Sequence, residues 1–186
     1  STTDTLDPAT YENGWITSVN FAFHNHIGEV DDSGAMVPEL AESWEVENGA
    51  KTWGFNLRQG VEFHSGGTLS ADDVVWSMNR HLGEDSPSSI KAFFGNVVEW
   101  NKVYGSTVKF TLSSPDADMP IKLTHFQAKI VKKDTTDFSK GAGTGPYLVE
   151  SFQPGVKSVH VRNSNYWRDT GQYLDCLLYT SPSPRD

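Results

Sequence analysis

Histidines and paired acids are the side chains of this 186-residue sequence that are best suited to chemistry. His24 and His26 suggest a metal site, because imidazole is a common ligand of transition metals. On a helix, however, residues two apart point to nearly opposite sides and cannot hold one ion together. His64 lies in a turn before a helix, and His81 lies near a helix end, where a cation is mildly favoured. The sequence therefore predicts no metal ligands.

Two acidic pairs suggest glycoside hydrolysis, in which carboxylates converge across a bond at about 5–9.5 Å. Asp72 and Asp73 are adjacent in the first turn of a predicted helix, where acids complement the helix dipole and can cap the turn. This structural role suits Asp72 and Asp73 better than catalysis. The pair Glu84-Asp85 offers no stronger case, so neither pair is interpreted as catalytic.

The glycines at 141, 143 and 145 resemble a phosphate-binding loop. A dinucleotide fingerprint needs a strand before the glycines and a helix after them. Here a strand is predicted to follow, Pro146 stands where the last glycine would be, and no Lys-Ser/Thr pair comes next. The sequence also lacks a Gly-x-Ser-x-Gly elbow, and its one cysteine is Cys176. We therefore expect no ATP binding, no catalytic residues and no cofactor.

The formal net charge of -9 is spread along the chain. An acidic surface repels phosphate backbones and anionic lipid headgroups, so we expect neither a nucleic-acid partner nor binding to a membrane surface. No apolar run approaches the roughly 20 residues that a membrane-spanning helix needs.

Three helices are predicted. The first runs from Trp15 to Ile27, where apolar residues recur every three to four positions. The clearest helix begins at Ser70, which can form a capping box with Asp73. A short helix follows Ser86-Pro87 and carries Ile90, Phe93 and Phe94.

Strands are predicted where apolar residues alternate. Trp44 and Val46 face a core from one strand, and Asn48-Gly49 makes a tight hairpin to the next. Pro154-Gly155 turns between the last two strands. The other predicted strands lie at 53–57, 108–112, 147–149 and 159–161. The pattern predicts a mixed α/β domain with largely antiparallel local pairing.

The last eleven residues, 176–186, read CLLYTSPSPRD. Two Ser-Pro pairs cannot continue a central strand, because proline lacks the N–H donor. We expect this tail to be non-native and disordered, and the domain to occupy residues 1–175.

Three segments in order resemble the family-5 extracellular solute-binding proteins, which include the dipeptide, oligopeptide and nickel receptors of ABC importers. The first is LDP at 6–8 with VPELAESWEV at 37–46. The second is WGFNLRQGVEFH at 53–64 with SADDVVWS at 70–77, and the third is GTGPY at 143–147 with RNSNYW at 162–167. Glycines of the third segment are expected to adopt turn conformations.

The resemblance implies a type II periplasmic-binding-protein fold, of which this chain holds part of lobe I. It implies a receptor that captures peptides or related small solutes and delivers them to an ABC permease. Such a receptor is expected to be monomeric, without enzyme activity of its own, and either periplasmic or lipid-anchored at the cell surface. Because half the cleft is absent, we expect the chain alone to bind ligand weakly, which calorimetry with peptides can test, and to leave sheet edges exposed.

The residues expected to face the ligand cleft lie in two segments. One is the loop of Tyr11, Glu12, Asn13 and Gly14 after the Leu6-Asp7-Pro8 turn, and the other is Phe93-Phe94. Aromatic rings and free backbone groups suit a peptide or small polar ligand. The alternative is that Tyr11 lies on the surface and that Phe93 and Phe94 belong to the core.

Two other functions stay open. One is a signalling or chemotaxis receptor that reuses the same fold, and the other is a hydrolase on a mixed α/β domain. A metal chelate also stays open as the ligand, because nickel receptors belong to the family that the sequence resembles.

Overall fold

The computed structural model describes residues 4–11, 13–170 and 172–180. Its helices are α1 (Gly14–Phe23), α2 (Ala71–Asn79), α3 (Met119–Lys122) and a 3-10 helix, η1 (Lys91–Phe94). Its strands are β1 (Gly28–Val30), β2 (Met36–Pro38), β3 (Ala41–Glu47), β4 (Thr52–Leu57), β5 (Val97–Lys102), β6 (Thr107–Leu112), β7 (Tyr147–Gln153), β8 (Lys157–Arg162) and β9 (Cys176–Thr180).

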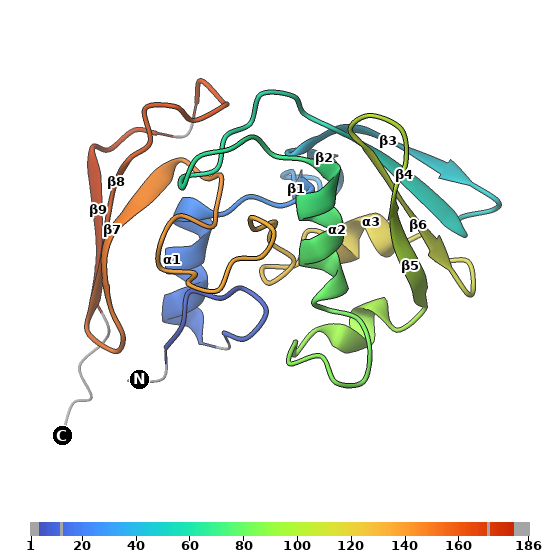
Figure 1. Ribbon diagram of the computed structural model, residues 1–186, viewed down its shortest axis with the longest axis horizontal. Coiled ribbons are helices and arrows are strands. Elements are labelled where there is room, and N and C mark those ends of the chain that lie inside the picture. Colours follow the sequence, from blue (N-terminus) through green and yellow to red (C-terminus); the bar gives the residue numbers. More distant parts are fainter. Residues whose placement is uncertain (1–3, 12, 171, 181–186) are drawn as a thin grey trace.

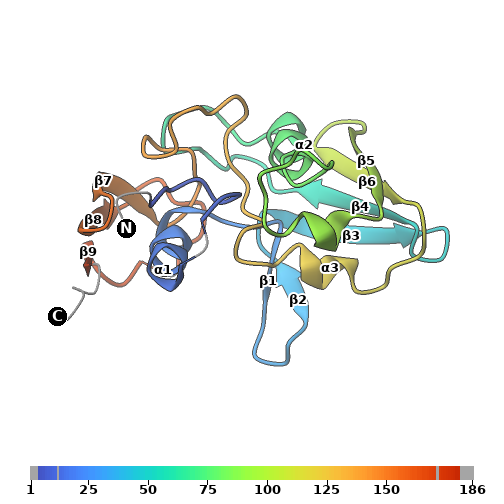
Figure 2. The same cartoon turned by 90° about the horizontal axis from the view of Figure 1, so that it is seen from below.

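Two antiparallel sheets lie on opposite sides of the molecule (Figure 1). One sheet has the order β3-β4-β6-β5 and packs against α2, and the other has the order β7-β8-β9 and packs against α1. The short β1–β2 hairpin projects between the two halves (Figure 2). The predicted mixed α/β fold with antiparallel pairing is thereby confirmed.

The β3–β4 hairpin forms as predicted, with positive φ at Asn48 (53°) and Gly49 (62°) in its turn. The prediction that Val46 faces a core is wrong, because its side chain is 54% exposed. β3 is the edge strand farthest from α2, which packs on β5 and β6. From this strand the fully buried Ala41 and the partly buried Trp44 reach the core.

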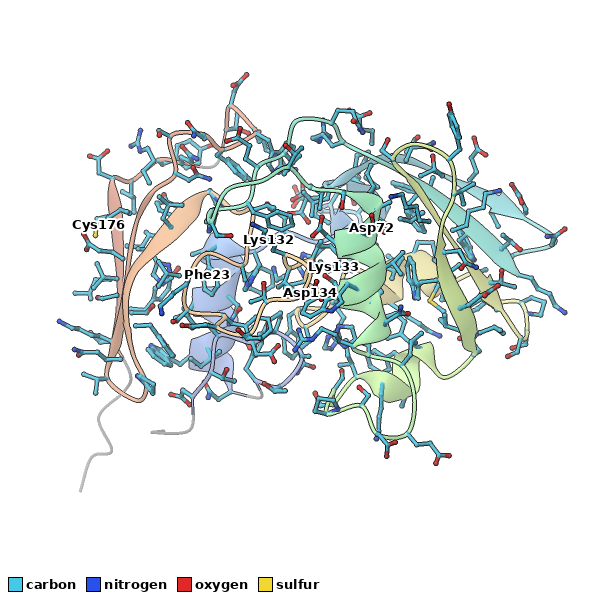
Figure 3. All side chains as sticks on the ribbon, in the orientation of Figure 1. Phe23, Asp72, Lys132, Lys133, Asp134 and Cys176 are labelled. Carbon is cyan, nitrogen blue, oxygen red and sulfur yellow. The ribbon has the colours of Figure 1, made fainter. Side chains whose placement is uncertain are left out.

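The predicted capping box at the start of α2 is present. Oδ2 of Asp73 accepts hydrogen bonds from the backbone N–H of Ser70 at 2.9 Å and from its hydroxyl at 2.6 Å. Oδ1 of the same carboxylate accepts from the backbone N–H of Lys133 at 2.8 Å, in the segment beside α2 (Figure 3). Asp73 thus joins two distant parts of the chain.

Replacing Asp73 with alanine is expected to lower the free energy of unfolding by about 2 kcal/mol, because a helix cap is lost and the part-buried hydrogen bond from the N–H of Lys133 is broken. Asp72→Ala is the matched control. Asp72 is half-exposed, and its ion-pair partner among the described residues is Lys102, at 2.8 Å, so its loss is expected to change stability by less than about 1 kcal/mol. Urea unfolding of both variants measures the difference, and equal midpoints would contradict this role of Asp73.

Two predictions between residues 80 and 94 need correction. The short helix after Ser86-Pro87 is only the single 3-10 turn η1, which buries Phe94 and leaves Phe93 43% exposed.

His81 is buried, and its Nδ1 lies 2.6 Å from the hydroxyl of Ser88. Burial, with help from Arg80, lowers the pKa of His81 to about 4. His81 is therefore neutral, and the expected favourable cation at the helix end is absent.

Helix α1 ends at Phe23, four residues before the predicted end. His24 is already extended, and Asn25 pairs with Ile130 in an isolated antiparallel bridge. The GTGPY segment lies directly against this helix end, where the N–H of Gly145 donates to the carbonyl of Phe23 at 3.1 Å. Tertiary contacts, rather than local propensity, therefore end the helix.

Gly143 and Gly145 have no positive φ. The expectation that these glycines serve turn conformations is therefore wrong for both. A Cβ on either residue would instead lie within 2.5 Å of the backbone of Phe23. Their role is to allow close approach to the end of α1.

The tail was expected to be disordered from Cys176, but residues 176–180 form β9, paired with β8. Tyr179 of β9 packs its ring edge against His160 and reaches the smaller core around α1. Residues 181–186, with both Ser-Pro pairs, lie outside the described residues. Among the helices of the described part, none has the length and apolar character to cross a membrane.

Candidate functional site

Four rings from three distant segments meet in one cluster, the aromatic surface, made of Tyr11, Phe93, His125 and Phe126. The ring of Phe93 contacts His125 edge-on with centroids 5.2 Å apart, and His125 lies 4.2 Å from Phe126. The ring of Phe126 is 5.9 Å from that of Tyr11, whose hydroxyl donates to the carbonyl of Phe126.

A buried amide holds these segments in register. Nε2 of Gln127 donates to the carbonyl of Tyr11 at 2.6 Å, and its Oε1 accepts from the hydroxyl of Ser89 at 2.8 Å. Burial, and to a lesser extent the charge of Asp7, raises the pKa of Tyr11. Its hydroxyl therefore remains a donor at neutral pH, and the aromatic surface is preorganised.

The structure divides the six residues that were predicted to face a ligand. Tyr11 and Phe93 come together on the aromatic surface, where Phe93 offers the exposed ring and Tyr11 is buried. Asn13 caps α1, its Oδ1 accepting from the N–H of Ile16 at 2.9 Å, and Gly14 begins that helix. Phe94 lies in the main core, and Glu12 lies outside the described residues. A ligand role for these residues remains a prediction.

His125 and Phe126 were missed from the sequence. They lie in a turn after α3, where no periodicity marks them, and only the adjacency of two rings could have drawn attention.

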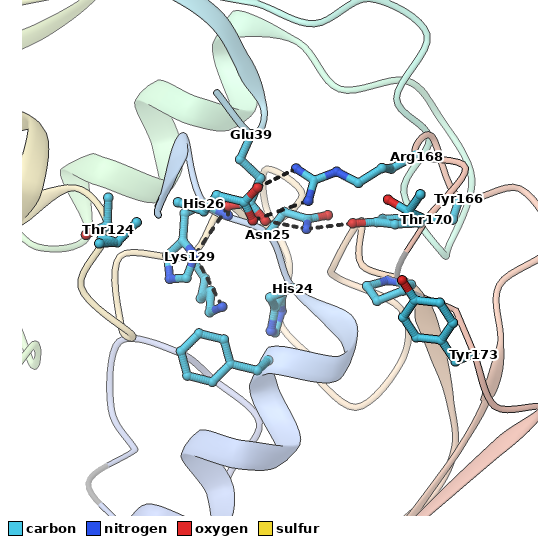
Figure 4. Close-up of a pocket in the computed structure, with 14 residues that line it drawn as sticks. His24, Asn25, His26, Glu39, Thr124, Lys129, Tyr166, Arg168, Thr170 and Tyr173 are labelled. Carbon is cyan, nitrogen blue, oxygen red and sulfur yellow. Dashed lines mark hydrogen bonds and ion pairs between the residues drawn. The ribbon is translucent and has the colours of Figure 1, made fainter. Parts of the chain in front are cut away.

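A second feature is a polar pocket of about 560 Å³ beside the end of α1 (Figure 4). Of the five predicted residues that the structure describes, none lines it. Its wall is formed by residues of α1, the 24–30 segment and the 166–173 segment, together with Glu39, Thr124, Lys129 and Pro146.

Asn25 is the centre of the hydrogen bonds in this pocket. Its Nδ2 donates to Oε1 of Glu39 at 2.6 Å and to the hydroxyl of Tyr166 at 3.3 Å. Its Oδ1 accepts from the hydroxyl of Thr144 at 3.0 Å and from Nε1 of Trp167 at 3.3 Å. The full capacity of one buried amide is thereby used, and it connects the first and the third of the sequence segments described above.

Glu39 is buried and charged. Burial raises its pKa, but hydrogen bonds from His26 and Asn25 and the nearby charge of Lys129 outweigh this and leave the pKa below its usual value. The backbone N–H of His26 donates to Oε2 of Glu39 at 2.7 Å. Burial and Lys129 lower the pKa of the His26 imidazole to about 4, so that ring is neutral.

Lys129 is only 2% exposed and is one of the residues that line the pocket. Nζ lies 3.4 Å from Nδ1 of His26 and 3.9 Å from the centre of the Phe21 ring. Among the described residues, no carboxylate forms an ion pair with it. Burial lowers the pKa of Lys129 to about 7, although the charge of Glu39 opposes the shift.

At the outer wall, Arg168 holds Glu29 through two contacts, at 3.3 and 2.9 Å, while its guanidinium stacks over Trp167. The charges of these two groups therefore offset each other at the rim.

Both His24 and His26 line this pocket, because the segment is extended rather than helical. The argument that a helix separates the two rings is therefore wrong. Even so, the described part of the chain contains no group of three or more His, Cys, Asp or Glu side chains arranged to hold a metal ion.

Comparison with known proteins gives consistent results. Residues 35–183 match the family model described as bacterial extracellular solute-binding proteins, family 5 Middle. The chain is 31% identical to di/tripeptide-binding protein 1 of Pseudomonas aeruginosa, over 94% of this chain and 38% of that protein. It is 30% identical to the dipeptide-binding protein of Escherichia coli, over 78% of this chain and 32% of that protein.

Among solved structures, the periplasmic binding protein AgaA of A. tumefaciens R10, in complex with agropinic acid, superposes with a TM-score of 0.87 at 27% identity. The superposition covers 96% of this chain and 37% of AgaA. The chain thus spans less than two fifths of the length of these relatives.

Proposed function

Because the chain belongs to the family-5 bacterial extracellular solute-binding proteins, we propose that it forms part of an extracytoplasmic receptor for peptides or related small solutes. The family-model match over most of the chain carries this proposal. The receptor would deliver its ligand to the transmembrane subunits of an ABC permease. The relatives named above are themselves described as binding dipeptides, tripeptides or agropinic acid.

The family is one of solute-binding proteins rather than enzymes. We infer that this chain catalyses no reaction, acts as a monomer without nucleic acid, and works in the periplasm or anchored to the cell surface. The signalling and hydrolase alternatives gain no supporting observation from the geometry or the comparisons.

For the ligand face we propose the aromatic surface, with Phe93 as its exposed ring. Aromatic side chains contribute large contact areas at small conformational cost. The ring of Phe93 is held in place by its edge-on contact with His125. Buried Tyr11 and half-buried His125 and Phe126 would position this ring rather than contact the ligand through their own faces.

In the longest reading frame that contains this sequence, Phe93→Ala is expected to weaken binding of the tripeptide Ala-Phe-Ala about 3- to 10-fold, which corresponds to the loss of one aromatic contact. Isothermal titration calorimetry measures the affinity. Tyr104→Ala is the control, because Tyr104 is 94% exposed at the distant β5–β6 turn. Unchanged affinity in Phe93→Ala would remove Phe93 from the ligand face, and absence of binding to any di- or tripeptide would contradict the peptide proposal itself.

A further inference from the structure

The polar pocket at the end of α1 is separate from the aromatic surface, with which it shares no residue. Its charged groups are Glu29, Glu39, Lys129 and Arg168. Arg168 and Glu29 pair with each other, and both oxygens of Glu39 accept hydrogen bonds from Asn25 and His26. Lys129 is the one cation among these that has no carboxylate in ion-pair contact within the described residues.

A buried cation without a matching anion is costly, because burial removes its hydration. The Lys129 ammonium carries three N–H donors, and the ring of Phe21 offers its face to one of them. Nδ1 of His26 lies 3.4 Å from the ammonium and also 3.4 Å from Oε2 of Glu39, so it is at best a weak and shared partner. An anionic oxygen in the pocket would satisfy the third donor and the charge together.

His24 supplies the complementary group. Its Nδ1 lies 2.9 Å from Oδ1 of Asn20, whose amide nitrogen already donates to the carbonyl of Ile16. Nδ1 of His24 therefore donates to Asn20, and Nε2 carries a free lone pair. That atom is buried and has no hydrogen-bond partner, although its ring lines the pocket. An unpaired acceptor in such a position calls for a donor on a ligand.

The geometry points to a binding site for a small carboxylate that carries a hydroxyl or amino group next to its carboxyl group. The carboxylate pairs with Nζ of Lys129, and the adjacent O–H or N–H donates to Nε2 of His24. Figure 4 shows both side chains directed into the pocket below Asn25. The volume of about 560 Å³ admits a molecule of this size.

The protonation state of Lys129 makes the ligand affinity of this site depend on pH. The pKa of Lys129 is about 7 in the empty pocket, and a bound carboxylate raises it. Binding therefore takes up a proton above pH 7, and affinity is expected to fall about 10-fold between pH 6 and pH 8. The other groups that face Lys129 do not titrate in this range, since Glu39 has a lowered pKa and the pKa values of both His24 and His26 lie well below 6.5.

The test uses the 186-residue chain and three sodium salts: glycolate, acetate and methoxyacetate. Only glycolate combines the carboxylate with an adjacent donor. We expect glycolate to bind at least about 5-fold more tightly than methoxyacetate, because methoxyacetate has no O–H to donate to Nε2 of His24. Amide resonances of residues 24–26 and 129 should shift on titration, and calorimetry in buffers of different ionisation enthalpy should show proton uptake at pH 8.

Lys129→Met is expected to abolish binding, whereas Lys140→Met, which removes an exposed lysine outside the pocket, is expected to leave it unchanged. Lys129→Gln repeats the test with a polar side chain, in case the methionine variant fails to fold. Equal affinities for glycolate and methoxyacetate, or equal binding by Lys129→Met, would overturn the proposal. Phe93→Ala should leave glycolate affinity intact, so the failure of this proposal and that of the peptide-receptor proposal are distinguishable.

Discussion

Replacing Gly143 with alanine is expected to destabilise the protein by about 3 kcal/mol or more, because the added methyl group overpacks a backbone contact that has no room to relax. A Cβ at this position would lie 1.9 Å from the carbonyl oxygen of Phe23 and 2.8 Å from the His24 ring. The same carbonyl accepts the N–H of Gly145, and the carbonyl of Gly143 accepts the N–H of His64. Any shift that relieves the clash therefore breaks hydrogen bonds on both sides.

Gly14→Ala is the matched control. Gly14 lies in the first turn of α1 with no atom within 4 Å of an added Cβ and without positive φ, so alanine is expected to be neutral or slightly stabilising there. Thermal unfolding followed by circular dichroism compares the two. Similar melting temperatures for Gly143→Ala and the unsubstituted protein would show that the α1–GTGPY contact is looser than described.

Lys129→Met is expected to stabilise the protein at pH 6, by up to about 5 kcal/mol if the whole pKa shift reflects burial. The pKa of this lysine is 10.5 in an exposed chain and about 7 in the fold. Below pH 7 the ammonium is charged in both states, and the folded state bears the full penalty. Between pH 7 and pH 10.5 only the unfolded state retains the proton, so the stability of the unsubstituted protein rises with pH.

The advantage of Lys129→Met should therefore shrink steadily from pH 7 to pH 10. Urea unfolding at pH 6, 8 and 10 measures this difference, in which other titrating groups cancel because both proteins contain them. Lys140→Met, at a side chain 80% exposed, should show no such slope. A difference that is constant over this range would mean that Lys129 is not desolvated in the fold.

The elements that sequence reasoning located well are those whose cause is local. The capping box of Ser70 and Asp73 and the positive φ values of Asn48 and Gly49 depend on neighbouring residues alone, and both appear as predicted. The early end of α1 depends instead on Gly145 and Ile130, which are more than a hundred residues away. Periodicity within 15–27 contains no trace of these contacts.

The candidate sites show the same division. Tyr11 and Phe93 could be selected as aromatic residues in predicted loops or short helices, but their meeting through His125 and Phe126 requires the fold. The pocket of Lys129 was not predicted at all, because a lysine followed closely by Lys132 and Lys133 carries no motif that sets it apart. The role of 176–180 was misjudged, since the prolines that suggested disorder begin only after β9 ends.

The bonds of Asn25 imply an order in which parts of the chain can reach their native packing. Its partners at Ile130, Thr144, Tyr166 and Trp167 leave the ribosome long after Asn25 itself. The β3–β6 sheet, built between residues 41 and 112, has its strands early and can assemble first. Helix α1 can bury its apolar face only after these later segments are present, so it is expected to reach its native packing after that sheet although it precedes the sheet in sequence.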